Sequence, residues 1–114
     1  MPAVGYTPID VAREFQHRVA KLEPVVAAFL QYDQRGNRLT VTTLMENFDH
    51  AAEDQLASVE VFLNHTFEDY AFDFSTIHLQ GRDPSQFMPA EGGSLMVFDR
   101  TGRNRQAEPR RVVG

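Results

Sequence analysis

Residues 70–79 read YAFDFSTIHL, and this stretch decides how the fold is arranged. Its aromatic and β-branched residues are typical of a strand. Successive side chains on a strand point to opposite faces. The even-numbered positions share an aromatic face: Tyr70, Phe72, Phe74, Thr76 and His78. The odd-numbered positions share the other: Ala71, Asp73, Ser75, Ile77 and Leu79.

The residues before this strand predict a helix and a second strand. Asp49 is the expected cap of a helix that runs to about Asn64. Apolar residues at helical spacing give it one buried stripe, made of Ala52, Leu56, Val59 and Leu63. Residues 39–45 read LTVTTLM, which suits a strand. A strand, helix, strand succession predicts two parallel strands joined by a right-handed crossover.

The N-terminal half predicts a further helix and an antiparallel hairpin. Thr7, Pro8 and Asp10 are typical of a helix start, and we expect Pro24 to end that helix. The apolar run 25–33 should pair with residues 39–45, because Gly36 and Asn37 tolerate the positive φ of a tight turn.

A loop over residues 80–93, with one helical turn at 83–84, leads to a last short strand at 95–98. We therefore predict an α+β fold in the order α-β-β-α-β-β. Its mixed four-stranded sheet has both helices packed on one face, which buries both amphipathic stripes.

The charge pattern divides the chain into a body and a tail. Residues 100–114 carry five Arg and one Glu, whereas residues 1–99 carry six basic and fifteen acidic residues. We expect one α+β domain over 1–99 and a flexible arginine-rich tail over 100–114. The tail could contact an anion or nucleic acid through Arg103, Arg105, Arg110 and Arg111. The acidic body argues against a nucleic-acid surface there, since phosphate binding needs a cationic stripe.

Composition excludes several kinds of site. The chain has no Cys, so disulfides, thiolate zinc sites and cysteine nucleophiles are ruled out. No Gly-x-Ser-x-Gly elbow, phosphate loop or dinucleotide fingerprint is present, and we expect no cofactor. Neither a secretory signal nor an apolar run of membrane-spanning length appears, so a cytoplasmic location without membrane contact is expected.

Two groups of residues are candidates for chemistry. His50 and Asp54 lie four apart on a helix and could face a divalent metal, although acidic residues also gather at helix starts for electrostatic reasons. Asp49 and Glu53 have the same spacing. Asp73, half buried among aromatic residues, could act as a ligand or general base, with His78 facing the other way. Its alternative role is as a polar residue on the wetter side of the sheet.

The acidic helix start and the Phe72-Asp73-Phe74 strand resemble the second half of small nucleotidyltransferase-like domains, over residues 25–80 at most. That family places a Gly-Ser turn and paired metal-binding acids before and within the strand at 39–45, which has no acid here. The resemblance implies a catalytically inactive copy with Asp73 as a remnant of the third acid. Residues 47–82 also resemble uncharacterised small bacterial proteins, which implies no activity.

These observations favour a non-enzymatic interaction or regulatory module that binds a protein partner or a second copy of itself. One alternative is a small metal-dependent or hydrolytic enzyme that uses Asp49, His50, Asp54 or Asp73. The other is nucleic-acid contact through the arginine-rich tail.

Overall fold

The computed structural model describes residues 5–87 and 94–100 and confirms the predicted α+β class. Helix α1 spans Pro8–Val19 and α2 spans His50–Thr66. The strands are β1 (Val25–Asp33), β2 (Arg38–Met45), β3 (Ala71–His78) and β4 (Ser94–Asp99). Short 3-10 turns lie at Gln34–Gly36 and Pro84–Gln86, the second of them capped by Asp83.

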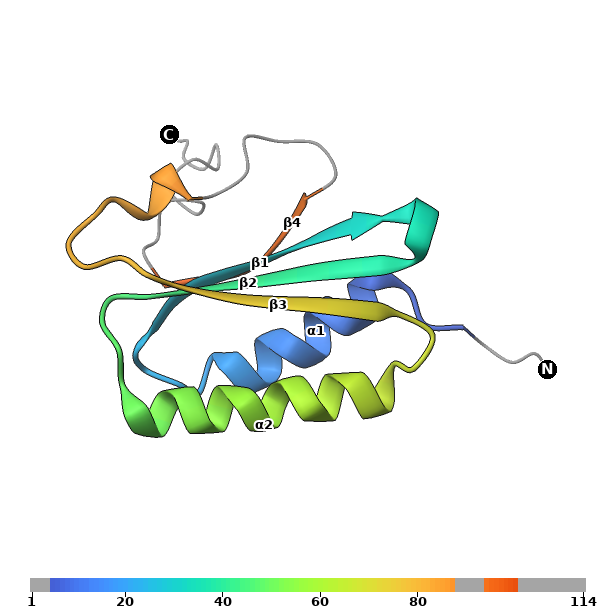
Figure 1. The fold of residues 1–114 in the computed structure, drawn as a ribbon, viewed down its shortest axis with the longest axis horizontal. Helices are drawn as coiled ribbons and strands as arrows, with labels where there is room; N and C mark the ends of the chain where they lie inside the picture. The colour runs from blue at the N-terminus through green and yellow to red at the C-terminus, as the bar shows by residue number, and fades with distance from the viewer. Residues whose placement is uncertain (1–4, 88–93, 101–114) are drawn as a thin grey trace, which may run out of the picture.

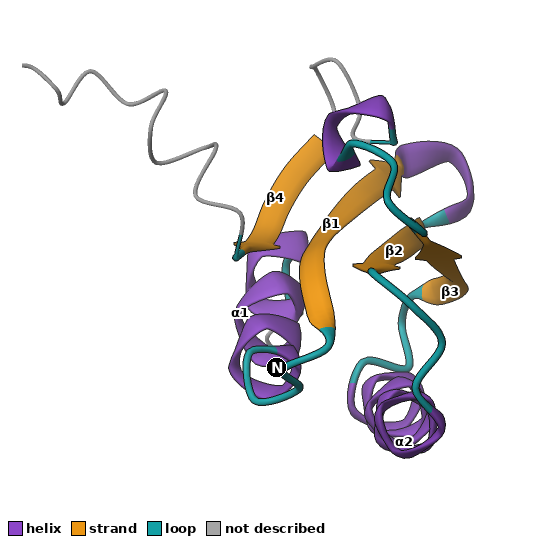
Figure 2. Ribbon diagram, turned by 90° about the vertical axis from the view of Figure 1, so that its left-hand side faces the viewer, coloured by secondary structure: helices purple, strands orange, loops and turns teal. Residues whose placement is uncertain are grey.

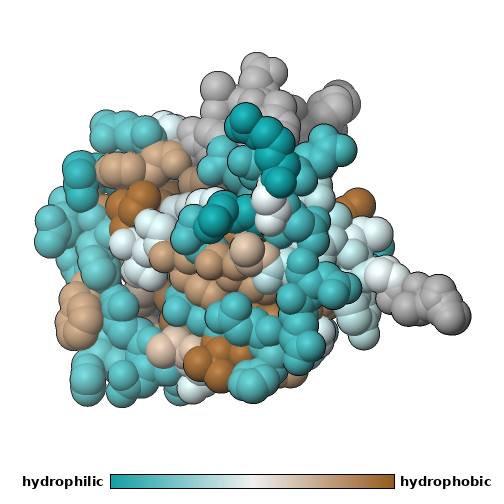
Figure 3. All heavy atoms as spheres, turned by 45° about the vertical axis from the view of Figure 1, so that its right-hand side comes forward, coloured by the Kyte–Doolittle hydropathy of each residue, from teal (hydrophilic) through white to brown (hydrophobic). Residues whose placement is uncertain are grey.

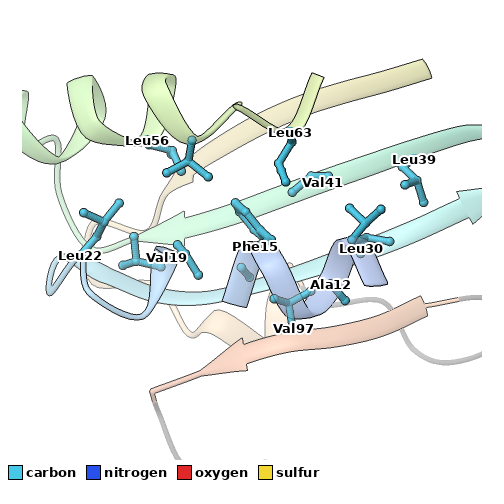
Figure 4. Packing of buried hydrophobic residues seen from close by; sticks show 14 of the residues in the cluster. Ala12, Phe15, Val19, Leu22, Leu30, Leu39, Val41, Leu56, Leu63 and Val97 are labelled. Carbon is cyan, nitrogen blue, oxygen red and sulfur yellow. The ribbon is translucent and has the colours of Figure 1, made fainter. Parts of the chain in front are cut away.

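The strands form a mixed sheet in the order β3-β2-β1-β4. Strand β1 is antiparallel to both β2 and β4, whereas β2 and β3 are parallel and α2 connects them, as predicted. Both helices cover the same face of the sheet (Figures 1 and 2). The main core lies between this face and the helices, where Phe15 of α1 and Leu63 of α2 meet the strand residue Val41 (Figure 4).

A smaller apolar cluster lies on the opposite face of the sheet. It consists of Ala27, Phe29, Leu44 and Leu79. Phe87 packs against this cluster, so the segment after β3 covers part of the face that the helices leave open (Figure 1).

Helix α1 begins as predicted and ends earlier than predicted. Thr7 and Asp10 form the reciprocal capping box. The helix ends at Val19 with Ala20 as its C-cap, so Pro24 is not the residue that ends it. Leu22 is nevertheless buried, because the turn that follows the helix directs it into the core.

The hairpin has the predicted pairing and a different turn. Asn37 adopts a positive φ of 50°, whereas Gly36 ends a 3-10 turn and does not. Tyr32 donates a hydrogen bond to Asn37 Oδ1 at 2.6 Å, and the Asn37 amide donates to the carbonyl of Asp69 at 2.6 Å. Asn37 therefore ties the turn to the residues that precede β3.

Arg100 belongs structurally to the body, although we predicted it as the first residue of the tail. Its guanidinium donates to the carbonyls of Val25 (2.9 Å), Leu22 (3.1 Å) and Ala20 (3.4 Å). Ala20 is the C-cap of α1, and carbonyls at a helix C-terminus lack partners within the helix and attract cations, which favours a guanidinium at this place. Residues 101–114, with the four other tail arginines, lie outside the described part.

We predict that Phe15→Ala lowers the free energy of unfolding by about 3–5 kcal/mol, because Phe15 is fully buried between α1 and the sheet. Ile9→Ala on the same helix should change it by about 0.5 kcal/mol or less, since Ile9 is 53% exposed. Urea denaturation of both variants measures the difference. Equal losses would contradict this account of the core.

Candidate interaction site

The face of β3 toward the helices brings His78 to Glu53 of α2. His78 Nε2 lies 2.6 Å from Glu53 Oε2, and both side chains are partly buried. The ring of Phe48 lies 6.0 Å from that of His78 in an edge-on arrangement. The sequence did not predict Glu53 as the partner of His78, because the two residues are 25 positions apart and only the register of β3 brings them together.

Asp73 lies on the opposite face of the sheet and does not meet His78. Arg38 donates to its carboxylate at 3.0 Å, and Asp73 is 61% exposed. The expected half-burial is therefore wrong: β3 lies at the edge of the sheet, where this face is open to water. Its contact with Arg38 makes Asp73 one partner of a surface ion pair between neighbouring strands.

His50 and Asp54 pair with each other at the start of α2. His50 Nε2 lies 3.7 Å from Asp54 Oδ2, and both side chains are largely exposed. Asp49 accepts the N–H of Ala52 as the cap of α2. Within residues 5–87 and 94–100, no three His, Asp or Glu side chains gather into a possible metal site. Of the residues of the enzyme alternative, Asp49, His50 and Asp54 lie together at the start of α2, whereas Asp73 lies apart on the far face of the sheet.

The outer edge of β3 carries backbone groups that the sheet does not use. Ala71 N–H donates to Asn37 O at 3.0 Å, and Leu79 N–H donates to Met45 O at 2.7 Å. Because backbone groups alternate in direction along a strand, the odd-numbered residues bond to β2 and the even-numbered residues point outward. In the described part of the chain, β3 has β2 as its one neighbour. The N–H and C=O groups of Phe72, Phe74 and Thr76 are thus free to pair.

Aromatic side chains line this edge on the helix-covered face. The rings of Phe72 and Phe74 are stacked, 5.3 Å apart and nearly parallel, and both are partly buried. Tyr70 continues the row at 6.4 Å from Phe72. Figure 3 shows apolar surface in the middle of the face that it presents, bordered by hydrophilic side chains. The period-two aromatic pattern of residues 70–79 was the sequence signal for this row.

Glu60 lies on the same side of α2 as Glu53, since seven residues make two turns. Burial, and secondarily the charge of Glu53, raise the pKa of Glu60 above its ordinary 4.5. Helix α2 thus presents a partly buried carboxylate beside β3, which the sequence pattern did not single out.

Comparison with known proteins provides no evidence for a function. No protein-family model matches the chain, and no curated protein sequence matches it. The resemblance to nucleotidyltransferase-like domains stays a prediction. No helix in the described part combines the length and apolar character needed to cross a membrane.

We predict that His78 and Glu53 couple energetically. A double-mutant cycle with His78→Ala and Glu53→Ala, followed by urea denaturation, should give a coupling energy of about 0.5–3 kcal/mol, because the contact is short and partly buried. The matched cycle on the exposed His50 and Asp54 should give about 0.5 kcal/mol or less. Equal coupling in the two cycles would mean that burial of the first pair has no energetic consequence.

Replacement of Glu60 should change how stability depends on pH. A carboxyl with a raised folded-state pKa binds its proton more tightly in the folded state, so its charged form destabilises the fold as pH rises above 4.5. The Glu60→Gln variant should therefore be more stable than the wild-type protein at pH 7, and this gain in stability should vanish below about pH 4. Thermal unfolding across pH 4–8 tests this. The exposed Glu23→Gln should show little gain at any pH.

Proposed function

We propose that this protein is a non-enzymatic interaction module that pairs with a second copy of itself through the edge of β3. The observation that carries the proposal is the row of outward backbone groups at Phe72, Phe74 and Thr76, within an eight-residue strand. Long edge strands are templates for strand addition unless charged side chains, proline, a bulge or a covering segment protects them. Residues 71–78 contain neither proline nor lysine, and their one acidic residue, Asp73, is paired with Arg38 of β2.

Symmetry restricts how two such edges can pair. A twofold axis perpendicular to the sheet places the two β3 strands antiparallel and keeps both sets of helices on one side. Outward residues must then face outward residues, which any register centred on one residue of β3 satisfies. The registers centred on residue 74 or residue 75, at the middle of the strand, overlap the two strands most fully. A register centred on residue 73 would set two aspartates directly opposite, which is destabilising.

The contact between Arg82 and His78 favours the register centred on Phe74. Arg82 donates to the carbonyl of His78 at 2.7 Å, so this outward group already has a partner. Centring on Ser75 would require the same carbonyl for pairing with Phe72 of the second copy. Centring on Phe74 pairs Phe72 with Thr76 of the second copy and leaves His78 undisturbed.

The register centred on Phe74 also places the aromatic side chains of the two copies next to each other. The stacked Phe72 and Phe74 of the two copies would form one aromatic cluster across the axis, and aromatic cross-strand pairs contribute about 0.2–1 kcal/mol each. On the other face, Asp73 would lie opposite Ser75 of the second copy. Its charge stays balanced by Arg38 of its own chain.

We predict that the protein is a dimer at high micromolar concentration and that Thr76→Pro makes it a monomer. The N–H of Thr76 points away from β2, so proline there removes an intermolecular hydrogen bond and leaves the β2–β3 ladder in place. Size-exclusion chromatography with light scattering gives the mass of both forms. A monomeric unchanged protein at this concentration contradicts the proposal.

Single-cysteine variants test the register, because the described chain contains no cysteine of its own. Hydrogen-bonded antiparallel pairs place Cα atoms about 5.5 Å apart, which suits a disulfide. Phe74→Cys should therefore cross-link two chains on mild oxidation. Val61→Cys, at an exposed apolar position of α2, is the matched control and should not. Cross-linking through both positions alike would indicate random collision.

A further inference from the structure

A small cavity lies beside the start of α1 and the end of α2. Figure 1 shows that these two helix ends lie at the same end of the molecule. Its volume is about 170 Å³. The residues that line it are Tyr6, Thr66, Phe67, Glu68, Asp69 and Tyr70. This volume is several times the roughly 30 Å³ of one water and below the roughly 300–1,000 Å³ of pockets that enclose drug-sized ligands. The cavity is therefore sized for a small head group.

The aromatic walls of the cavity are held in fixed positions. The rings of Tyr6 and Phe67 lie 4.9 Å apart and nearly perpendicular, at 84°. The hydroxyl of Tyr70 donates to the carbonyl of Tyr6 at 2.6 Å, which joins the segment before α1 to the start of β3. Phe67 is buried, whereas Tyr6 is 53% exposed. One wall is thus anchored in the core and the other opens to solvent.

The surroundings of the cavity are negative. Glu68 and Asp69 are exposed lining residues, and none of the six lining residues is basic. Burial raises the pKa of Tyr70, and negative charge from Asp10 and Asp69 adds to the effect. The C-terminal end of α2 adds the partial negative charge of its last carbonyl groups.

We propose that this cavity binds the alkylammonium group of an organic cation. Aromatic faces attract cations through their quadrupoles, and aromatic cages are a recurring solution for quaternary ammonium groups. The carboxylates of Glu68 and Asp69 supply long-range attraction at the rim. A simple anion or an uncharged apolar group would not gain from this combination. The lining residues do not include Phe72, Phe74 or Thr76, so the binding test below does not require that the protein dimerise.

The direct test is an NMR titration with tetramethylammonium at constant ionic strength. The ring resonances of Tyr6, Phe67 and Tyr70 should shift and saturate with a Kd on the order of millimolar, as expected for a few weak cation–π contacts. Tert-butanol, which has a similar shape and no charge, should leave these resonances unchanged. Equal shifts with both compounds, or none with either, would overturn the proposal.

Matched variants separate binding from folding. Tyr6→Leu keeps an apolar side chain and removes the aromatic face, so we expect about a tenfold weaker Kd, with little change in Tm because Tyr6 is half exposed. Asp69→Asn removes one charge and should weaken binding a few-fold at low salt. Glu23→Gln, an exposed acid that does not line the cavity, should leave the Kd unchanged. A Kd insensitive to both cavity variants would refute the site.

Two further ligands distinguish the source of the ammonium group. Choline represents a free small molecule, and a short peptide with one trimethyllysine represents a modified protein side chain. A peptide Kd at least tenfold below that of choline assigns the cavity to a protein partner. A choline Kd equal to or below that of the peptide assigns it to a metabolite. Failure of both ligands to shift the cavity resonances counts against the proposal.

Discussion

The parallel pairing of β2 with β3 is the contact on which the rest of the structure depends. It runs in unbroken register from Arg38 opposite Ala71 to Met45 opposite His78. This register determines which residues of β3 meet the helices and which face water, so it separates His78, beside Glu53, from Asp73, beside Arg38. It also uses one row of backbone groups on β3 and leaves the outward groups of Phe72, Phe74 and Thr76 without a neighbouring strand in the described part of the chain.

Local signals were strong enough to predict every helix and strand of the described chain. The capping box at Thr7, the cap at Asp49 and the apolar stripe of α2 each involve residues close together in the chain, so the spacing of those residues predicts them. The residue at which α1 ends was harder to predict from the sequence. The Ala20 and Leu22 carbonyls after the helix accept hydrogen bonds from Arg100, about 80 positions away, and no local pattern reports that contact.

The candidate sites differ in the same way: a contact within one helix could be predicted from the sequence, whereas contacts between distant segments could not. The spacing of His50 and Asp54 correctly indicated that they could meet, because both lie on one helix. The contact between His78 and Glu53 and the cavity beside Tyr6 join segments that are distant in the chain. Such arrangements depend on strand register and on where the N-terminal segment crosses the end of α2. Alternation in the sequence indicates the face of a residue and does not identify its partner.

The guanidinium of Arg100 also constrains the order in which the chain can complete its structure. Its acceptors lie between 75 and 80 residues earlier, near the junction of α1 and β1. During synthesis that junction emerges first, and its carbonyls lack the hydrogen bonds from Arg100 until the final strand arrives. Addition of β4 therefore closes a loop of 80 residues, and the entropy cost of loop closure favours its addition after the local elements have formed.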